Sequence, residues 1–236
     1  MRNFKYLDDM IQSGAHEIIL DSDIVLDEGE EAEYSKGIDL DVDRLSIDGN
    51  GHTIDAKGKA RIFNITAHNV MIRNITFKNG FSPNDGGAIS GIGVIQLKIE
   101  DSQFKSNASK GKGGAIFNHN RLILIDCLFD ENESDLGGGA IYNCRGCKLY
   151  VCNSSFANNS SGMNGGAIDN FGDLKIEESV FKNNKSKGCG GAIASDEPEF
   201  KRCRPPYRCI RTICDLFYID CEFENNNPDD VFKKSK

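Results

Sequence analysis

The amino-acid sequence predicts an all-β protein, a single-stranded parallel β-helix (solenoid) of about eight coils with a short N-terminal capping helix. Three observations lead to this prediction. The tetrapeptide Gly-Gly-Ala-Ile recurs along the chain, the pattern Phe-x-x-Asn recurs in phase with it, and apolar and polar residues alternate between the two. No segment of the repeat region holds the 3.6-residue period of an amphipathic helix.

The glycine pair of the tetrapeptide marks a tight corner. The tetrapeptide occurs five times, at steps of 27, 25, 27 and 25 residues, starting at Gly86, Gly113, Gly138, Gly165 and Gly190. Glycine adopts backbone angles closed to other residues, so we expect both glycines of each pair to use them in turning the chain. The alanine fits a cramped interior position, and the isoleucine points into the core. The glycines assigned this structural role include Gly113, Gly114, Gly138, Gly139, Gly165 and Gly166.

The phenylalanine of Phe-x-x-Asn supplies bulk for the core, and the asparagine marks a second corner. In five copies the phenylalanine lies nine residues before the next glycine pair. We expect each phenylalanine to stack on its counterpart one coil away, and the asparagine amides to hydrogen-bond along the axis as a ladder. The repeat residues are Phe104, Phe129, Phe156 and Phe181, with Asn107, Asn132, Asn159 and Asn184.

Short strands with one buried face are predicted before each phenylalanine. The positions seven and five residues before it are apolar, which is the two-residue period of a strand. One repeat is too short to bury this face alone, so stacked coils must build the core. The position three residues before the phenylalanine is polar, at Asn74, Asp101, Asp126, Asn153, Glu178 and Asp220.

Weaker coils of the same kind occupy the first 80 residues. Strand-like runs at 17–20, 38–43, 45–54 and 61–65 are broken by Gly, Asp and Asn, as expected of short strands joined by turns. A second ladder is predicted by another asparagine column, at Asn118, Asn143 and Asn170.

The first fifteen residues predict a helical cap rather than an export signal. Phe4, Leu7, Met10 and Ile11 fall at helical spacing, and Gly14 is a stop signal. Charged residues stand where a signal peptide has its apolar run. We therefore expect no signal peptide or anchor in this chain, and either a place inside the cell or a longer parent protein.

Composition limits the classes of function. The chain has 236 residues and a net charge of −8, an acidic balance that argues against a general nucleic-acid binder. No apolar run approaches the ~18 residues of a spanning helix, which argues against membrane insertion. Length suits one domain over 1–236, with a cap at 1–15, an inserted loop at 195–214 and a tail at 227–236.

The repeat resembles known surface proteins. Gly-Gly-Ala-Ile alternating with Phe-x-x-Asn resembles the repeat of the polymorphic outer membrane proteins of chlamydiae. Residues 45–80 resemble adhesin-like surface proteins of methanogenic archaea, in Ile-Asp-Gly-Asn-Gly-His-Thr-Ile-Asp at 47–55 and Asn-Ile-Thr-Phe-Lys-Asn-Gly at 74–80. These resemblances imply a right-handed parallel β-helix of the pectate-lyase-like kind, a cell-surface or extracellular place, and a role in attachment.

The largest break in the repeat is the binding site that the sequence predicts. About 15 to 17 extra residues lie between Ile193 and Leu216. Long loops on rigid scaffolds often carry function, and arginine beside an aromatic ring suits an anionic sugar or a protein surface. An incidental loop is the alternative. The residues assigned to binding are Lys201, Arg202, Arg204, Tyr207, Arg208 and Arg211.

An enzyme of the pectate-lyase-like class is the less favoured alternative. Asp101 and Asp126 occupy one column in adjacent coils, close enough for the paired carboxylates of glycoside hydrolysis. The same column holds Asn74 and Asn153, which favours a polar outward face over a tuned pair. We therefore assign no catalytic residue.

The sequence predicts no metal and no cofactor. Nine cysteines are an odd number, which cannot all pair within one molecule. Cys144-x-x-Cys147 is half a zinc knuckle without a second pair at ligand spacing, so free thiols with one or two disulfides are favoured. Asp39, Asp41 and Asp43 lack the glycine and glutamate of an EF-hand loop, which favours a solvated acidic strand over calcium.

Three functions from different classes are carried forward. We favour a non-catalytic, adhesin-like surface module that recognises a glycan or a protein. The first alternative is a polysaccharide lyase or glycoside hydrolase. The second is a structural spacer that associates end to end with copies of itself through its coil ends.

Overall fold

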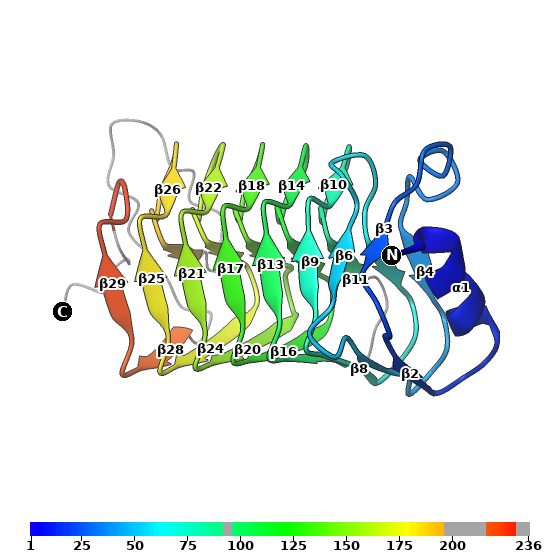
Figure 1. Cartoon of the computed structure of the whole chain (residues 1–236). Coiled ribbons are helices and arrows are strands. Elements are labelled where there is room, and N and C mark those ends of the chain that lie inside the picture. Colours follow the sequence, from blue (N-terminus) through cyan, green and yellow to red (C-terminus); the bar gives the residue numbers. More distant parts are fainter. Residues whose placement is uncertain (92–95, 196–215, 230–236) are drawn as a thin grey trace.

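The computed structural model confirms the parallel β-solenoid, and it describes residues 1–91, 96–195 and 216–229. Successive coils stack along one axis, from helix α1 at one end to strand β29 at the other (Figure 1). Strand pairing between neighbouring coils is parallel and in register, as for Phe104 opposite Phe129 and Ile116 opposite Ile141. Phe104, Phe129 and Phe156 therefore lie in one file, as predicted.

Four parallel sheets form the walls. Sheet A has nine strands: β1 (Arg2–Asn3), β3 (Ile24–Val25), β6 (Thr53–Asp55), β9 (Thr76–Lys78), β13 (Gln103–Lys105), β17 (Leu128–Asp130), β21 (Ser155–Ala157), β25 (Val180–Lys182) and β29 (Glu222–Glu224). Sheet B has eight: β2 (Glu17–Ile19), β5 (Ser46–Asp48), β8 (Val70–Arg73), β12 (Leu97–Glu100), β16 (Arg121–Ile125), β20 (Lys148–Cys152), β24 (Asp173–Glu177) and β28 (Leu216–Ile219).

The other two sheets complete each coil. Sheet C has seven strands: β4 (Ile38–Leu40), β7 (Phe63–Ile65), β11 (Ile89–Gly91), β15 (Ile116–Asn118), β19 (Ile141–Asn143), β23 (Ile168–Asn170) and β27 (Ile193–Ser195). Sheet D has five: β10 (Phe81–Ser82), β14 (Ala108–Ser109), β18 (Glu133–Ser134), β22 (Ser160–Ser161) and β26 (Lys185–Ser186). The strand numbers agree with the expected coil count, and the runs predicted within the first 80 residues contain strands.

Helix α1 (Phe4–Gln12) covers the N-terminal end of the solenoid, as predicted. Its buried side chains are Phe4, Leu7 and Ile11, and it packs against β1, β3 and β4, the first strands of sheets A and C. The Asn3 side chain caps the helix by accepting a hydrogen bond from the Tyr6 backbone N–H at 3.0 Å. The helix therefore shields apolar residues that would otherwise face water at the end of the stack.

A file of stacked phenylalanine rings runs through the core behind sheet A. Neighbouring rings from Phe104 to Phe181 lie 4.6–4.7 Å apart and within 2° of parallel. Phe77 and Phe223 extend the file at 4.6 and 5.1 Å. Because the strand spacing sets the ring spacing, the parallel sheet and the stack favour the same register.

Asparagine amides form the predicted ladder at the corner that follows sheet A. Asn132 is fully buried. Its Nδ2 donates to Asn159 Oδ1 at 2.9 Å and to the Phe104 carbonyl at 3.0 Å. Its Oδ1 accepts from the Asn107 backbone N–H at 3.1 Å and from Asn107 Nδ2 at 2.9 Å. The same contacts repeat along the ladder, whose members are Asn107, Asn132, Asn159, Asn184 and Asn226.

The second predicted ladder follows sheet C. Asn118 Nδ2 donates to Asn143 Oδ1 at 2.6 Å, and Asn143 Nδ2 donates to Asn170 Oδ1 at 2.6 Å. Asn170 Nδ2 continues to Ser195 Oγ at 2.9 Å. Each buried amide is thus satisfied by the next coil, which removes the penalty of burying a polar group.

The two glycines of Gly-Gly-Ala-Ile have different roles. The first glycine of each pair has a left-handed backbone, for example φ +69° at Gly138, as predicted. The second, such as Gly139, does not, and there the prediction was wrong. A Cβ on Gly139 would lie 2.0 Å from the Gly166 carbonyl oxygen of the next coil. The second glycine is required because the backbones approach closely.

Replacing Asn132 by Ala is expected to destabilise the fold by roughly 3–5 kcal/mol, because the partners of its amide lose buried hydrogen bonds. Urea unfolding followed by circular dichroism measures the change. Asn120→Ala is the matched control, since the Asn120 side chain makes no hydrogen bond among the described residues. We expect it to change stability by less than about 0.5 kcal/mol. Equal losses for both variants would contradict the ladder's role.

Replacing Gly139 by Ala is expected to cost at least about 3 kcal/mol, because the new methyl group meets the backbone of the neighbouring coil. Gly146→Ala is the control for backbone strain without a steric clash. Gly146 has a left-handed backbone with φ +76°, but a Cβ added there would have no atom within 4 Å. That control should cost only about 1–2 kcal/mol. Thermal unfolding of both variants measures the difference, and a smaller loss at Gly139 would refute the close-approach explanation.

Candidate binding groove and corner cleft

The predicted binding residues of the insert, Lys201 to Arg211, lie outside the described residues. Strands β27 and β28 stand on either side of the insertion, so it interrupts the passage from sheet C to sheet B. The binding role of Lys201, Arg202, Arg204, Tyr207, Arg208 and Arg211 stays a prediction.

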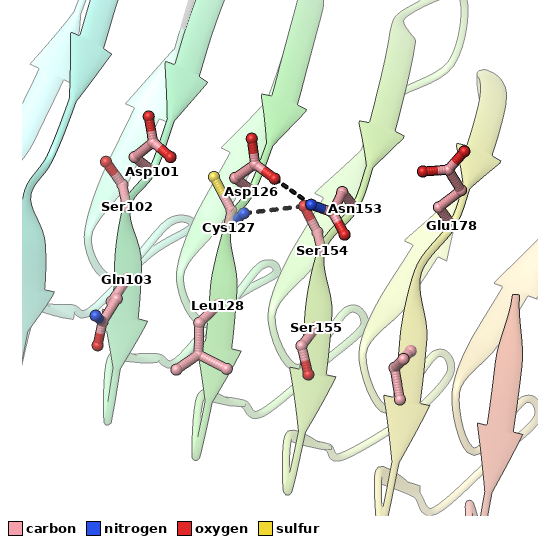
Figure 2. A pocket seen from close by; sticks show the side chains of 11 residues that line it. Asp101, Ser102, Gln103, Asp126, Cys127, Leu128, Asn153, Ser154, Ser155 and Glu178 are labelled. Carbon is pink, nitrogen blue, oxygen red and sulfur yellow. Dashed lines mark hydrogen bonds between the residues drawn. The ribbon is translucent and has the colours of Figure 1, made fainter.

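A cleft of about 430 Å³ lies at the corner between sheets B and A (Figure 2). It crosses successive coils, and its upper rim carries Asp101, Asp126, Asn153 and Glu178. The remaining lining residues are Ser102, Gln103, Cys127, Leu128, Ser154, Ser155 and Val180.

Backbone conformation explains the polar rim of this cleft. Asp101, Asp126, Asn153 and Glu178 all have left-handed backbones, with φ between 47° and 54°. Asparagine and aspartate tolerate this conformation better than most residues because their short polar side chains bond locally. One such residue per coil turns the chain from sheet B into sheet A. The turn at this corner therefore explains why the sequence has a polar residue three positions before the repeat phenylalanines.

Asp101 and Asp126 do lie in adjacent coils, but both carboxylates are exposed. Asp126 Oδ1 accepts a hydrogen bond from Asn153 Nδ2 (Figure 2). A glycosidase acid normally sits in a partly buried environment that tunes it for proton transfer. The enzymatic alternative stays a prediction, and the corner conformation supplies a sufficient reason for the two residues.

A third ladder, which the sequence analysis missed, runs beneath the rim. Ser154 Oγ accepts from the Cys127 backbone N–H at 3.1 Å and donates to the Cys152 carbonyl at 2.8 Å. In the next coil, Ser179 Oγ accepts from the Ser154 backbone N–H at 3.1 Å. The available signal was the small polar residue found two positions before the repeat phenylalanine, at Ser102, Cys127, Ser154, Ser179 and Cys221.

Cys127 belongs to this ladder rather than to a reactive site. Its Sγ donates to the Ile125 carbonyl at 3.3 Å, in the position where other coils place a serine hydroxyl. Burial raises the pKa of the Cys127 thiol to about 12. A catalytic cysteine requires the opposite shift, since the thiolate is the nucleophile.

The larger hollow is a groove of about 750 Å³ on the outer face of sheet B. Strand alternation builds it: Leu122 and Leu124 of β16 enter the core, while Arg121, Ile123 and Ile125 face outward. Four neighbouring strands, β12, β16, β20 and β24, contribute its lining. The groove residues are Lys98, Arg121, Leu122, Ile123, Ile125, Lys148, Leu149, Tyr150, Asp173, Leu174 and Lys175.

Two ion pairs lie on either side of the apolar centre of the groove. Lys98 Nζ lies 2.6 Å from Glu100 Oε1 on β12, and Lys175 Nζ lies 3.0 Å from Glu177 Oε1 on β24. Between these strands, Ile123, Ile125 and Tyr150 present half-exposed apolar surface. The groove is therefore apolar along its middle and charged along its sides.

The Tyr150 side chain in the groove hydrogen-bonds to Glu177 on the neighbouring strand. Its Oη donates to Glu177 Oε2 at 2.5 Å, and Lys175 Nζ lies 5.3 Å from the centre of its ring. The Tyr150 hydroxyl and the Lys175 ammonium together lower the pKa of Glu177. The same hydrogen bond, with burial, raises the pKa of Tyr150. Glu177 consequently stays ionised to lower pH than an ordinary glutamate.

The candidate metal ligands do not gather in the part of the chain that the structure describes. No group of three His, Cys, Asp or Glu side chains there is arranged to hold an ion. Asp39 instead accepts from Asn64 Nδ2 at 2.7 Å, and Asp43 from the His68 backbone N–H at 2.7 Å. Cys144 and Cys147 are free thiols, whereas Cys189 is disulfide-bonded. Among residues 1–91, 96–195 and 216–229, no helix has the length and apolar character to cross a membrane.

Comparison with known proteins supports the repeat. Residues 101–119, 126–144 and 178–196 match the Chlamydia polymorphic membrane protein repeat. Each matched segment starts at a left-handed corner residue and contains one strand each of sheets A, D and C. The match confirms the resemblance to the chlamydial repeat, and it assigns the repeat unit to most of one coil.

A curated relative matches a larger share of the chain. The sequence is 30% identical over 151 residues, or 61% of its length, to the probable autotransporter YfaL of Escherichia coli (strain K12). The aligned segment is 11% of that protein, so the chain spans a small part of the relative. No solved structure matches the chain.

Alkylation should distinguish the buried thiol of Cys127 in the ladder from the half-exposed thiol of Cys152. At pH 8 we expect native Cys127 to react with iodoacetamide at least about a hundredfold more slowly than free cysteine, because burial and its raised pKa leave little thiolate. The rate should rise as the pH approaches 12. Peptide mass spectrometry measures labelling, with half-exposed Cys152 as the internal control. Rapid labelling of Cys127 before unfolding would disprove its placement in the ladder.

Proposed function

We propose that the chain is a surface-exposed β-helix module of the passenger kind, which binds glycan or protein ligands in an adhesin-like manner. The observation that carries this proposal is the match of three segments to the chlamydial membrane-protein repeat, together with similarity to a probable autotransporter over 61% of the chain. The resemblance of residues 45–80 to methanogen adhesin-like proteins points in the same direction.

The division between the inside and outside of the coils supports a binding role. Inward positions repeat one residue type, as in the phenylalanine file and the asparagine ladders. An outward column of sheet B reads Lys98, Ile123, Tyr150 and Lys175 along successive strands. Packing sets the inward residues, whereas the outward residues vary without disturbing the core. Such a scaffold presents a long surface whose chemistry is free to suit a ligand.

The partners remain predictions of the sequence. These are a surface glycan or protein as ligand, no nucleic acid, no membrane insertion, and end-to-end self-association as the spacer alternative. Concentration-dependent assembly of the purified chain without ligand would favour the spacer.

Surface exposure is tested directly on the organism that makes the protein. Antibodies raised against the folded chain are expected to stain intact cells, and external protease should remove the signal. Staining that appears only after permeabilisation would contradict the proposal. An antibody against a cytosolic protein of the same cells controls for leakage.

Binding is tested with the purified chain on arrays of glycans and of extracellular proteins. We expect at least one reproducible ligand class with the native chain. The heat-unfolded chain serves as the matched control and should lose the signal. Binding that is equal for the native and unfolded chains would show that the coil surface is not the determinant.

A further inference from the structure

We propose that the groove on the outer face of sheet B binds an anionic glycan, a sugar chain that carries carboxylate or sulfate groups. This inference rests on the proposed function, since it names the ligand class and the surface of the module. It assigns binding to strands β12, β16, β20 and β24 rather than to the inserted loop.

Two cations lie side by side at the edge of the groove, with one carboxylate on the next strand. Arg121 and Lys148 are direct register neighbours on β16 and β20, and both are exposed. Lys148 also lies opposite Asp173 of β24. Among the described residues, however, neither Arg121 nor Lys148 has a carboxylate within the 4.0 Å of an ion pair. Like charges directly opposite each other on neighbouring strands are unfavourable, and a bound anion would relieve that repulsion.

The other cations of the groove are already neutralised. Lys98 is paired with Glu100 and Lys175 with Glu177. The remaining charged residues of the groove are Arg121, Lys148 and Asp173, two cations and one anion. This edge therefore keeps a net positive charge, centred on Arg121 and Lys148, on a protein whose net charge is −8. An anionic group of a ligand finds one attractive position along this edge, because guanidinium and ammonium groups both donate charge-assisted hydrogen bonds to carboxylate and sulfate oxygens.

The centre of the groove suits the rest of a sugar chain. Ile123, Ile125 and Tyr150 offer apolar surface to the C–H faces of sugar rings. Glu100 and Glu177 lie on the flanking strands and accept hydrogen bonds from hydroxyl groups. Four strands at roughly 4.8 Å spacing span about 14 Å, which is room for a short oligosaccharide.

An acidic peptide fits this face less well than a glycan. Extended peptides usually gain affinity by pairing their backbone with an exposed sheet edge. The groove lies on a sheet face, where β16 and β20 already pair with strands on both sides. A ligand here must be recognised by side chains alone, and sugar rings with their hydroxyl and anionic groups offer matching contacts.

The test compares the native chain with an Arg121→Gln/Lys148→Gln double variant by fluorescence anisotropy. The probes are a labelled heparin oligosaccharide, a hyaluronan oligosaccharide of similar length, neutral dextran and poly-glutamate. We expect binding of at least one anionic glycan, weakening with added salt, and a loss of at least tenfold in the double variant. Heparin and hyaluronan separate sulfate from carboxylate recognition.

A matched control removes the same charge elsewhere. Lys78 and Lys105 are also register neighbours, on sheet A, and lie outside the groove. Lys78→Gln/Lys105→Gln should leave glycan affinity within about twofold of the native value. Ile123→Thr keeps a β-branched residue at the floor and should weaken glycan binding about three- to fivefold by removing apolar contact. Both double variants should unfold at temperatures close to that of the native protein.

Three results would overturn the inference. The first is that poly-glutamate and the glycans bind with equal affinity and Ile123→Thr has no effect. Affinity would then depend only on the negative charge of the ligand. Another is equal loss in both double variants. The third is loss of glycan binding when a six-residue link replaces residues 195–214, which would return the site to the insert. A chain that binds other array ligands but no anionic glycan would refute this inference while the proposed function stands.

Discussion

Buried amides that hydrogen-bond to their own counterparts hold this structure in register. An asparagine side chain inside a protein needs partners for two donors and an acceptor. Asn132 finds them in the two neighbouring coils, at Phe104 and Asn107 in one and at Asn159 in the other. A coil displaced by one residue would leave these groups unpaired in the core. The ring stack and the parallel sheets impose the same one-strand spacing, so three separate interactions favour a single register.

This constraint separates the fold from its function. The interior is built from a few repeated residues whose task is the same in every coil, and their similarity to surface-protein repeats follows from that task. The exterior carries no such requirement. The groove on sheet B therefore combines apolar side chains, two ion pairs and two unpaired cations in an arrangement that the core neither demands nor explains. These outward side chains can change to suit a ligand without disturbing the core.

Periodicity made most of the interior visible in the sequence. Phe104 and Asn107 recur at distances that only stacked coils explain, and both the ring file and the ladder were predicted from them. The Ser154 ladder was missed because serine and cysteine share the column, and a mixed column is a weaker signal than a uniform one. Gly139 was misjudged because sequence cannot distinguish a glycine needed for its φ from one needed for space.

The repeat in the chain thus determined the coils and the buried columns, because these depend on residues that are equivalent in every turn. The helical spacing of Phe4, Leu7 and Ile11 determined the cap. The groove was decided only when the coils were stacked. Arg121 and Lys148 are 27 residues apart and become neighbours solely through strand register, as do Ile123 and Tyr150. Outward side chains do not repeat, so sequence periodicity does not predict which of them will be neighbours. Only the packing of the coils brings them together on one surface.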